Sequence, residues 1–160
     1  MRIAVHAVGR MKAGPERELA DRYFDRFSKA GPPLGLEWAG VTEAPESRAG
    51  SADERRREEA ARLITHLGGG TALVLLDERG NNPGSQEFAG WLARYRDDGQ
   101  RSVMIAIGGH DGHAPELRGD AALVMSLGAL TWPHQLVRIM IAEQLYRAAT
   151  ILSGHPYHRA

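Results

Sequence analysis

The sequence predicts an α/β fold in which helices flank a largely parallel sheet. Strand-like and helix-like segments alternate along all 160 residues, which is the pattern of repeated βαβ units. Three apolar runs, TALVLLD, SVMIAI and AALVMSL, are typical of strands that are covered on both faces. With 42% hydrophobic residues, the chain can bury one core, so we expect a single domain over residues 1–160.

The N-terminal part of the chain predicts two strands separated by a helix. Residues 2–8 alternate and are rich in β-formers, so we expect a first strand there. A Gly-Pro pair opens a helix over residues 15–27, because proline is favoured in a first helical turn. A short second strand should cover residues 34–41, after a double proline. The polar residues 42–50 predict a mobile loop.

The middle of the chain continues this alternation. Ser51 and Glu54 have the spacing of a capping box, which predicts a helix over residues 52–67 that ends at three glycines. Ser85 is a candidate N-cap for a helix that runs to about Arg96. The remaining elements are strands over residues 71–77, 102–107 and 121–127 and a short helical piece over residues 115–119.

The final helix should have Pro133 at its first position, run to about Leu152 and use Gly154 as its C-cap. It is apolar around most of its circumference, so it must be covered on several sides. In so small a domain, this pattern predicts a subunit interface as well as a core contact. Glu143 and Arg147 lie four residues apart, and we expect a salt bridge on the helix face.

Composition excludes several classes of site and partner. The chain has no cysteine, which excludes disulfides, thiolate zinc sites and thiol nucleophiles and fits a reducing cytoplasm. No apolar run reaches the roughly 18 residues of a membrane span, so we expect a cytoplasmic protein without a membrane partner. The 20 basic and 20 acidic residues balance. A general nucleic-acid coat protein would be basic, so an RNA partner would require a local basic patch.

A ligand of such a fold would lie at the carboxyl ends of the parallel strands. The three most buried strands end in distinctive loops, LLDERG, IGGHDGH and SLGALTWPHQ. Gly108 and Gly109 in the second loop let the backbone approach a ligand closely, because they have no Cβ. In the third loop, Leu130 and Trp132 flank backbone donors and acceptors, which suits a flat apolar ring.

Motifs for other ligands are missing from the sequence. No G-x-G-x-x-G follows the first strand and no Walker loop occurs, so nicotinamide and ATP sites are not expected. His110, Asp111 and His113 are close in sequence, but such residues in a glycine-rich loop are usually solvated. No helical histidine pair accompanies them, so we expect no metal.

The last residues, SGHPYHRA, carry an unusual set of reactive side chains for a chain end. His155, Tyr157, His158 and Arg159 could act on a proton or an anion. Pro156 would stiffen the segment beyond the final helix. His155 has an alternative role as a cap for the carbonyls of that helix.

Three motifs together resemble one family. GGHDG, LTWPHQLVRIMIAEQLYRA and HPYHR, in this order, resemble the bacterial ribosomal large-subunit pseudouridine N3-methyltransferases of the trefoil-knotted (SPOUT) class. The resemblance covers nearly the whole chain and is strongest over residues 103–159. It implies a deep C-terminal trefoil knot, a homodimer and S-adenosyl-L-methionine as the cofactor. The chain departs from the family at His110, commonly a small residue or proline, and at His113, often an apolar residue.

The resemblance assigns the cofactor to the three strand-end loops that the strand pattern also singles out. Carried over position by position, the cofactor-binding residues are Leu76, Gly108, Gly109, Leu127, Gly128, Ala129, Leu130, Thr131 and Trp132.

The implied reaction is methylation of N3 of a pseudouridine in 23S rRNA, within the large subunit or the assembled ribosome. The N3 proton must leave, so a general base or a cation beside the ring would help. We expect the substrate side of the site to consist of Tyr157, His158 and Arg159, in one subunit or across the dimer. His134 should lie nearer the cofactor, although it could instead cap the final helix. Two alternatives are a knotted methyltransferase for tRNA or another RNA, and a non-catalytic RNA-binding assembly factor.

Overall fold

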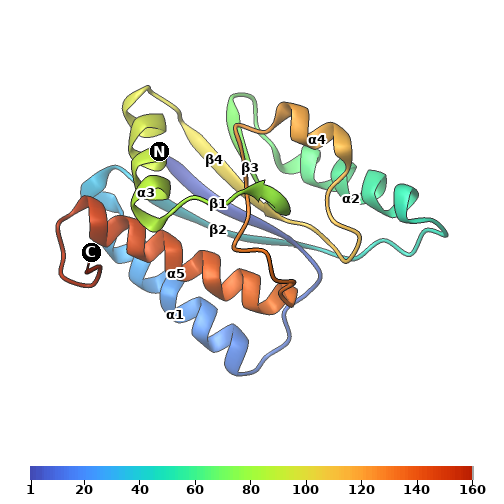
Figure 1. Cartoon of the computed structure of the whole chain (residues 1–160), viewed down its shortest axis with the longest axis horizontal. Helices are drawn as coiled ribbons and strands as arrows, with labels where there is room; N and C mark the ends of the chain where they lie inside the picture. The colour runs from blue at the N-terminus through green and yellow to red at the C-terminus, as the bar shows by residue number, and fades with distance from the viewer. Residues whose placement is uncertain (160) are drawn as a thin grey trace.

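The computed structural model describes residues 1–159 and contains a five-stranded sheet with helices on both faces (Figure 1). The sheet has the order β2-β1-β4-β3-β5, and all neighbouring strands are parallel. The predicted α/β fold with a parallel sheet is therefore confirmed. The strands are β1 (Arg2–Val8), β2 (Glu37–Ala44), β3 (Thr71–Asn81), β4 (Ser102–Ile107) and β5 (Leu123–Met125).

Helices of different parts of the chain cover the two faces of the sheet. They are α1 (Pro15–Ala30), α2 (Ala52–His66), α3 (Ser85–Asp97), α4 (Pro115–Asp120) and α5 (His134–Leu152). Successive strand residues point to opposite faces. On one face, Val5 and Ile105 belong to the main core, which α1, α3 and α5 cover. On the other face, Met104 packs in a smaller cluster with Leu63 of α2 and Leu117 of α4.

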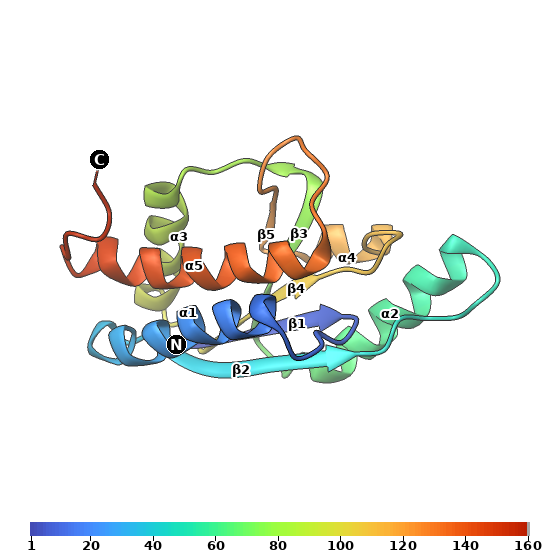
Figure 2. The same ribbon diagram turned by 90° about the horizontal axis from the view of Figure 1, so that it is seen from below.

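Helix α5 packs against both α1 and α3, and it runs beside α1 on the same face of the sheet (Figure 2). Its buried residues include Ile141 and Leu145, which are 0% exposed. Leu136, in contrast, is 40% exposed. The expected salt bridge on this helix is confirmed, because Oε1 of Glu143 lies 2.5 Å from Nη2 and 2.9 Å from Nε of Arg147.

The second strand begins later than predicted. Residues Pro32–Leu34 form a 3₁₀ turn that ends at Gly35 with a φ of 70°, so the expected strand over residues 34–41 is displaced to Glu37–Ala44. The prediction of a mobile loop over residues 42–50 is wrong at residues 42–44, which pair with β1. Further on, Ser47 is buried, and its N–H donates to Glu59 at 2.9 Å.

Strands β3 and β5 also differ from the expected ranges. β3 reaches Asn81 rather than Asp77, because the carbonyl of Asn81 accepts a hydrogen bond from the N–H of Ser126 at 2.6 Å. β5 covers only Leu123–Met125 instead of residues 121–127, and it lies at the edge of the sheet. The predicted burial of this third strand on both faces is therefore not observed.

Two predicted helix starts are also wrong by one position. Gly84, not Ser85, is the N-cap of α3, and the Ser85 hydroxyl instead donates to Oε1 of Gln144 at 2.8 Å. Pro133 occupies the N-cap position of α5, so the first helical residue is His134. The capping box of α2 is confirmed, with Ser51 and Glu54 bonded reciprocally.

The C-terminal end of α5 is closed by a Schellman motif. Gly154 has a φ of 69°, and its N–H donates to the carbonyl of Ile151 at 3.2 Å. The N–H of His155 donates to the carbonyl of Thr150 at 2.9 Å. The predicted glycine stop is therefore confirmed, and His155 contributes to the cap through its backbone.

Two expectations concern the whole chain. The order of strands and helices does not define how the C-terminal segment is threaded, so the trefoil knot stays a prediction. Within residues 1–159, no helix is both long enough and apolar enough to cross a membrane.

Candidate functional site

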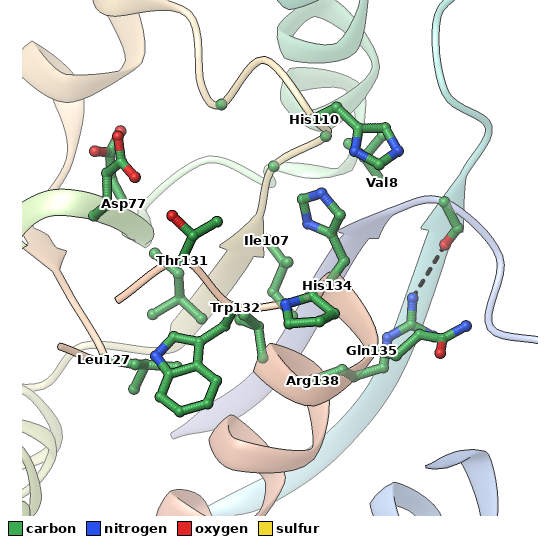
Figure 3. Close-up of a pocket in the computed structure, with 18 of the residues that line it drawn as sticks. Val8, Asp77, Ile107, His110, Leu127, Thr131, Trp132, His134, Gln135 and Arg138 are labelled. Carbon is green, nitrogen blue, oxygen red and sulfur yellow. Dashed lines mark hydrogen bonds between the residues drawn. The ribbon is translucent and has the colours of Figure 1, made fainter. Parts of the chain in front are cut away.

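A cavity of about 770 Å³ opens at the carboxyl edge of the sheet (Figure 3). Its floor includes the last residues of three strands, Val8, Ile107 and Met125, together with Leu76 of β3. The loops that follow these strands and the first turn of α5 form the walls. This is the edge at which parallel sheets bind ligands, and the volume is in the range of small-molecule sites.

The predicted cofactor residues converge on this cavity. All of them except Ala129 line it, namely Leu76, Gly108, Gly109, Leu127, Gly128, Leu130, Thr131 and Trp132. Leu130 is 70% exposed and Trp132 is 38% exposed, which is unusual for such large apolar side chains. Figure 3 shows the indole of Trp132 and the side chain of Leu127 on the same side of the opening. An apolar ring could therefore be covered here.

The loop after β5 is shaped by its own hydrogen bonds. The buried hydroxyl of Ser126 donates to the carbonyl of Gly128 at 2.8 Å and accepts from its N–H at 3.2 Å. Gly128 has a φ of 116°, which side chains with a Cβ rarely adopt. The loop thus presents backbone groups to the cavity in a fixed turn.

Neighbouring side chains leave little space for a Cβ at Gly108 and Gly109. A Cβ at Gly108 would lie 3.2 Å from the ring of His113, and a Cβ at Gly109 would lie 2.6 Å from Oε2 of Glu59. Nε2 of His113 also lies 3.2 Å from the carbonyl of Leu76. Burial lowers the pKa of His113, so its ring is a neutral spacer between two of the predicted cofactor loops.

Asp77 is a functional candidate that sequence reasoning missed. Its side chain is 4% exposed, lies in the cavity wall and has an oxygen 2.5 Å from Nη2 of Arg118. Burial alone would raise the pKa of Asp77, but the backbone N–H of Arg79 and the guanidinium of Arg118 lower it below its usual value. The site therefore contains a buried negative charge. The available signal in the sequence is an acidic residue at the end of the apolar run TALVLLD.

Arg138 connects α5 to the loop after β1 and to the end of β2. Its guanidinium pairs with Glu43 and donates to the carbonyl of Gly9 at 3.1 Å, the bond that the dashed line in Figure 3 marks. Glu43 also accepts from the N–H of Met11 at 3.0 Å. This buried arginine therefore fixes one wall of the cavity. In the sequence, Arg138 is only a cationic residue within an apolar helix, and no local pattern indicates that Glu43 is its partner.

Two histidines and a carboxylate lie together at the mouth of the cavity. The rings of His110 and His134 meet edge to face with 5.0 Å between their centroids, and they point toward each other in Figure 3. Nε2 of His110 is 3.4 Å from Oε1 of Glu46. Burial, and then the charge of His110, lower the pKa of His134. The ring of His134 is therefore neutral near pH 7 and can accept a proton.

The structure does not bring Tyr157, His158 and Arg159 to the cavity of their own chain. They follow the C-terminal end of α5, whereas the cavity lies at its N-terminal end (Figure 2). The hydroxyl of Tyr157 donates to Oε1 of Glu143 at 3.0 Å, and the guanidinium of Arg147 lies 4.9 Å from the Tyr157 ring centre. Burial, and then the contacts with Tyr23 and Glu143, raise the pKa of Tyr157, so its hydroxyl keeps its proton.

The histidines and acidic residues do not form a metal site in the part of the chain that the structure describes. No three of these side chains converge in an arrangement that could hold an ion. Asp111, close to His110 in sequence, is instead paired with Arg55 at 2.7 Å.

Comparisons with known proteins show the family of the chain. A family model described as predicted SPOUT methyltransferase matches residues 1–158. The chain is 67% identical to a protein of Brucella anthropi and 65% identical to a protein of Mesorhizobium japonicum, each over 160 residues and the whole of both chains. A protein of Brucella abortus is 63% identical over 169 residues, again across both whole chains. All three are named ribosomal RNA large subunit methyltransferase H.

Proposed function

Because the chain belongs to the SPOUT methyltransferase family, we propose that it methylates N3 of a pseudouridine in 23S rRNA with S-adenosyl-L-methionine as the donor. The substrate is the large subunit or the assembled ribosome, and the protein acts in the cytoplasm. The observation that carries this proposal is the cavity at the carboxyl edge of the sheet. It is lined by residues of the same loops that the family resemblance assigns to the cofactor.

The residues of the cavity fit the proposed cofactor. S-adenosylmethionine supplies a methyl group on a sulfonium that leaves readily, so the protein mainly has to position the reactants. Leu130 and Trp132 offer apolar surface for an adenine ring, and the turn at Gly128 offers backbone donors and acceptors. The ionised Asp77 also lies in the cavity wall, but Arg118 pairs with its charge, so the fit depends on the apolar surface and the backbone groups.

Removal of the N3 proton is assigned to His134. This side chain lines the cavity, and its lowered pKa favours the neutral form that accepts a proton. His155 and His158 are alternative bases, and both belong to the tail that follows the C-terminal end of α5. Tyr157, His158 and Arg159 form the substrate side of the site, where an aromatic ring can stack on the base and a guanidinium can hold a phosphate or a ring carbonyl.

The position of the tail supports a homodimer. Residues 157–159 and the cavity lie at opposite ends of α5, so the tail of one chain completes the cavity of its partner. Helix α5 supports this arrangement, because apolar residues surround it and Leu136 remains 40% exposed. A homodimer would cover this surface and join the two parts of the site.

RNA is bound through local basic groups, because the net charge of the chain is zero. Arg10 lines the cavity, and both Arg10 and Lys12 are exposed on the loop after β1. Arg147 and Arg159 add positive charge near the tail. Because these local basic groups are few, we expect a structured RNA target that offers the protein further contacts.

An assay with labelled donor tests this expectation. Purified ribosomes should be methylated, and tRNA should not. Equal methylation of bare 23S rRNA and intact ribosomes would contradict the preference for an assembled target.

Replacement of Arg159 by alanine tests the role of the tail. The variant should lose most or all of its RNA methylation activity, because the proposal assigns Arg159 to contact with the substrate. Its affinity for S-adenosylmethionine, measured by calorimetry, should equal that of the wild type. Wild-type turnover in Arg159→Ala would remove the tail from the site, and lack of cofactor binding by the wild type would favour a non-catalytic RNA-binding protein.

A further inference from the structure

Helix α2 makes charged contacts with the loop between Gly108 and Gly112. Nε of Arg55 lies 2.7 Å from Oδ2 of Asp111, and Nη2 lies 3.1 Å from Oδ1, so the guanidinium holds the carboxylate with two hydrogen bonds. Arg56 donates to the backbone carbonyl of the same aspartate at 3.2 Å. Two successive arginines of one helix thus bind both the side chain and the backbone of this loop.

A third residue of α2, Glu59, limits the space beside Gly109 of this loop. Glu59 is only 8% exposed, and its Oε1 accepts the N–H of Ser47 at 2.9 Å. Its other oxygen lies so close to Gly109 that a Cβ there would be 2.6 Å away. Gly109 does not have a positive φ. Its requirement for glycine therefore comes from the carboxylate of Glu59 and not from the backbone conformation.

The same helix also holds the segment that leads into it. Arg55 donates to the carbonyl of Ala49 at 3.0 Å, and Arg62 donates to the carbonyl of Pro45 at 2.6 Å. This segment contains Glu46, whose carboxylate faces His110 at the cavity mouth. α2 therefore fixes two neighbouring parts of the rim, although the described lining of the cavity includes no residue of this helix.

We propose that Arg55 and Glu59 are positioning residues that hold the Gly108–Gly112 loop in the shape that binds the cofactor. This inference rests on the proposed function, since the ligand is S-adenosylmethionine. A loop with three glycines in five residues has many accessible conformations when it is free. If only a fraction of molecules has the competent shape, the apparent dissociation constant rises by the inverse of that fraction. Neither side chain has to touch the ligand for this effect.

A double-mutant cycle on the ion pair tests the proposal. Arg55→Gln should raise the dissociation constant for S-adenosylmethionine about fivefold to tenfold, measured by calorimetry. Asp111→Asn should raise it at least as much, because Asp111 also lines the cavity. In the Asp111→Asn background, Arg55→Gln should have a smaller effect than in the wild type, since the ion pair is already lost and only the bond to the carbonyl of Ala49 remains to be removed. The matched control is Arg57→Gln on the same helix, whose exposed side chain donates one hydrogen bond among residues 1–159, to the carbonyl of Asp53.

A second test uses the contact between Glu59 and Gly109. Gly109→Ala should weaken cofactor binding, because the new methyl group is driven against the carboxylate. Adding Glu59→Ala should restore part of the affinity by making space. If the methyl group instead blocks the ligand directly, Glu59→Ala will restore nothing, and the role assigned to Glu59 is wrong.

The steady-state parameters separate positioning from a general loss of stability. In Arg55→Gln, KM for S-adenosylmethionine should rise while kcat at saturating cofactor stays at the wild-type value. An unchanged dissociation constant, with only a lower unfolding temperature, would overturn the proposal and leave a structural role. Failure of the wild type to bind the cofactor would instead refute the proposed function, so the two failures are distinguishable.

Discussion

His6 is the most unusual buried residue of the sheet. It lies in β1, is 1% exposed, and neither ring nitrogen has a hydrogen-bond partner among residues 1–159. Its ring centroid is 5.4 Å from that of His66. Burial, and then the charges of His66 and His113, lower the pKa of His6 from 6.5 to about 4. The folded protein therefore keeps this ring neutral over a range in which the unfolded chain protonates it.

Acid should destabilise the protein through His6. The pKa of His6 is lower in the folded protein than in the unfolded chain. The neutral ring therefore makes its full contribution to the free energy of unfolding above pH 6.5, and this contribution is lost as the pH falls toward about 4. The free energy of unfolding should drop by about 1 kcal/mol per pH unit in this window. Urea unfolding at a series of pH values measures this slope.

The variant His6→Leu should flatten that pH dependence, since it removes the titrating group. It should also be no less stable than the wild type at neutral pH, because no hydrogen bond of the ring is lost. The exposed His155→Gln serves as the control and should keep the wild-type slope. An equally steep slope in His6→Leu would assign acid sensitivity to other groups.

Single residues show what sequence patterns can and cannot predict. The strand pattern predicts a ligand site at the loop around Trp132, and this loop lines the cavity, because strand ends of a parallel sheet meet at one edge. The sequence suggests that Gly108 and Gly109 leave space for a ligand, but His113 and Glu59 also lie where their Cβ atoms would be. Glu59 lies on a different element, fifty residues earlier in the chain, and no local pattern connects the two.

At the scale of elements, partners decide where strands begin and end. Each predicted strand exists, but β2 and β3 are displaced or extended because pairing with β1 and β5 continues past the apolar run. The predicted helix ends agree better with the structure where a local motif determines them. The capping box at Ser51 and the glycine stop at Gly154 both form as expected, since their hydrogen bonds lie within a few residues.

The Schellman motif after α5 should set the direction of the tail. Gly154→Ala forces a Cβ into a φ of 69°, which should cost about 1 kcal/mol of stability. Because Tyr157 and Arg159 follow directly, RNA methylation should fall more than cofactor affinity does. Thermal unfolding, calorimetry and the methylation assay measure the three quantities. Equal losses of RNA methylation and cofactor affinity would mean that the turn does not direct the tail.

At the scale of the molecule, one helix separates the two halves of the proposed site. α5 has 19 residues and is therefore about 28 Å long at 1.5 Å per residue. The tail follows the C-terminal end of this helix, and residues of its N-terminal turns line the cavity. The strand order and this separation could not be read from the sequence, because local periodicity contains no information on which strands pair.

Mixed dimers test whether the tail acts across the interface. One variant has the tail change Arg159→Ala, and the other has the pocket change Gly128→Val, which is strained at a φ of 116°. Each alone should be inactive. After subunit exchange, half of the dimers contain one intact pocket facing one intact tail, so about a quarter of the wild-type activity should return. A site within one chain would give no recovery.

The cavity is assembled from both ends of the chain, since its lining extends from Val8 to Arg138. This has a consequence for biosynthesis. A nascent chain leaves the ribosome from its N-terminus, so strands β1 to β4 are exposed before the loop around Trp132 and helix α5 have emerged. The cavity is therefore complete only after α5 has been synthesised and has packed onto the sheet.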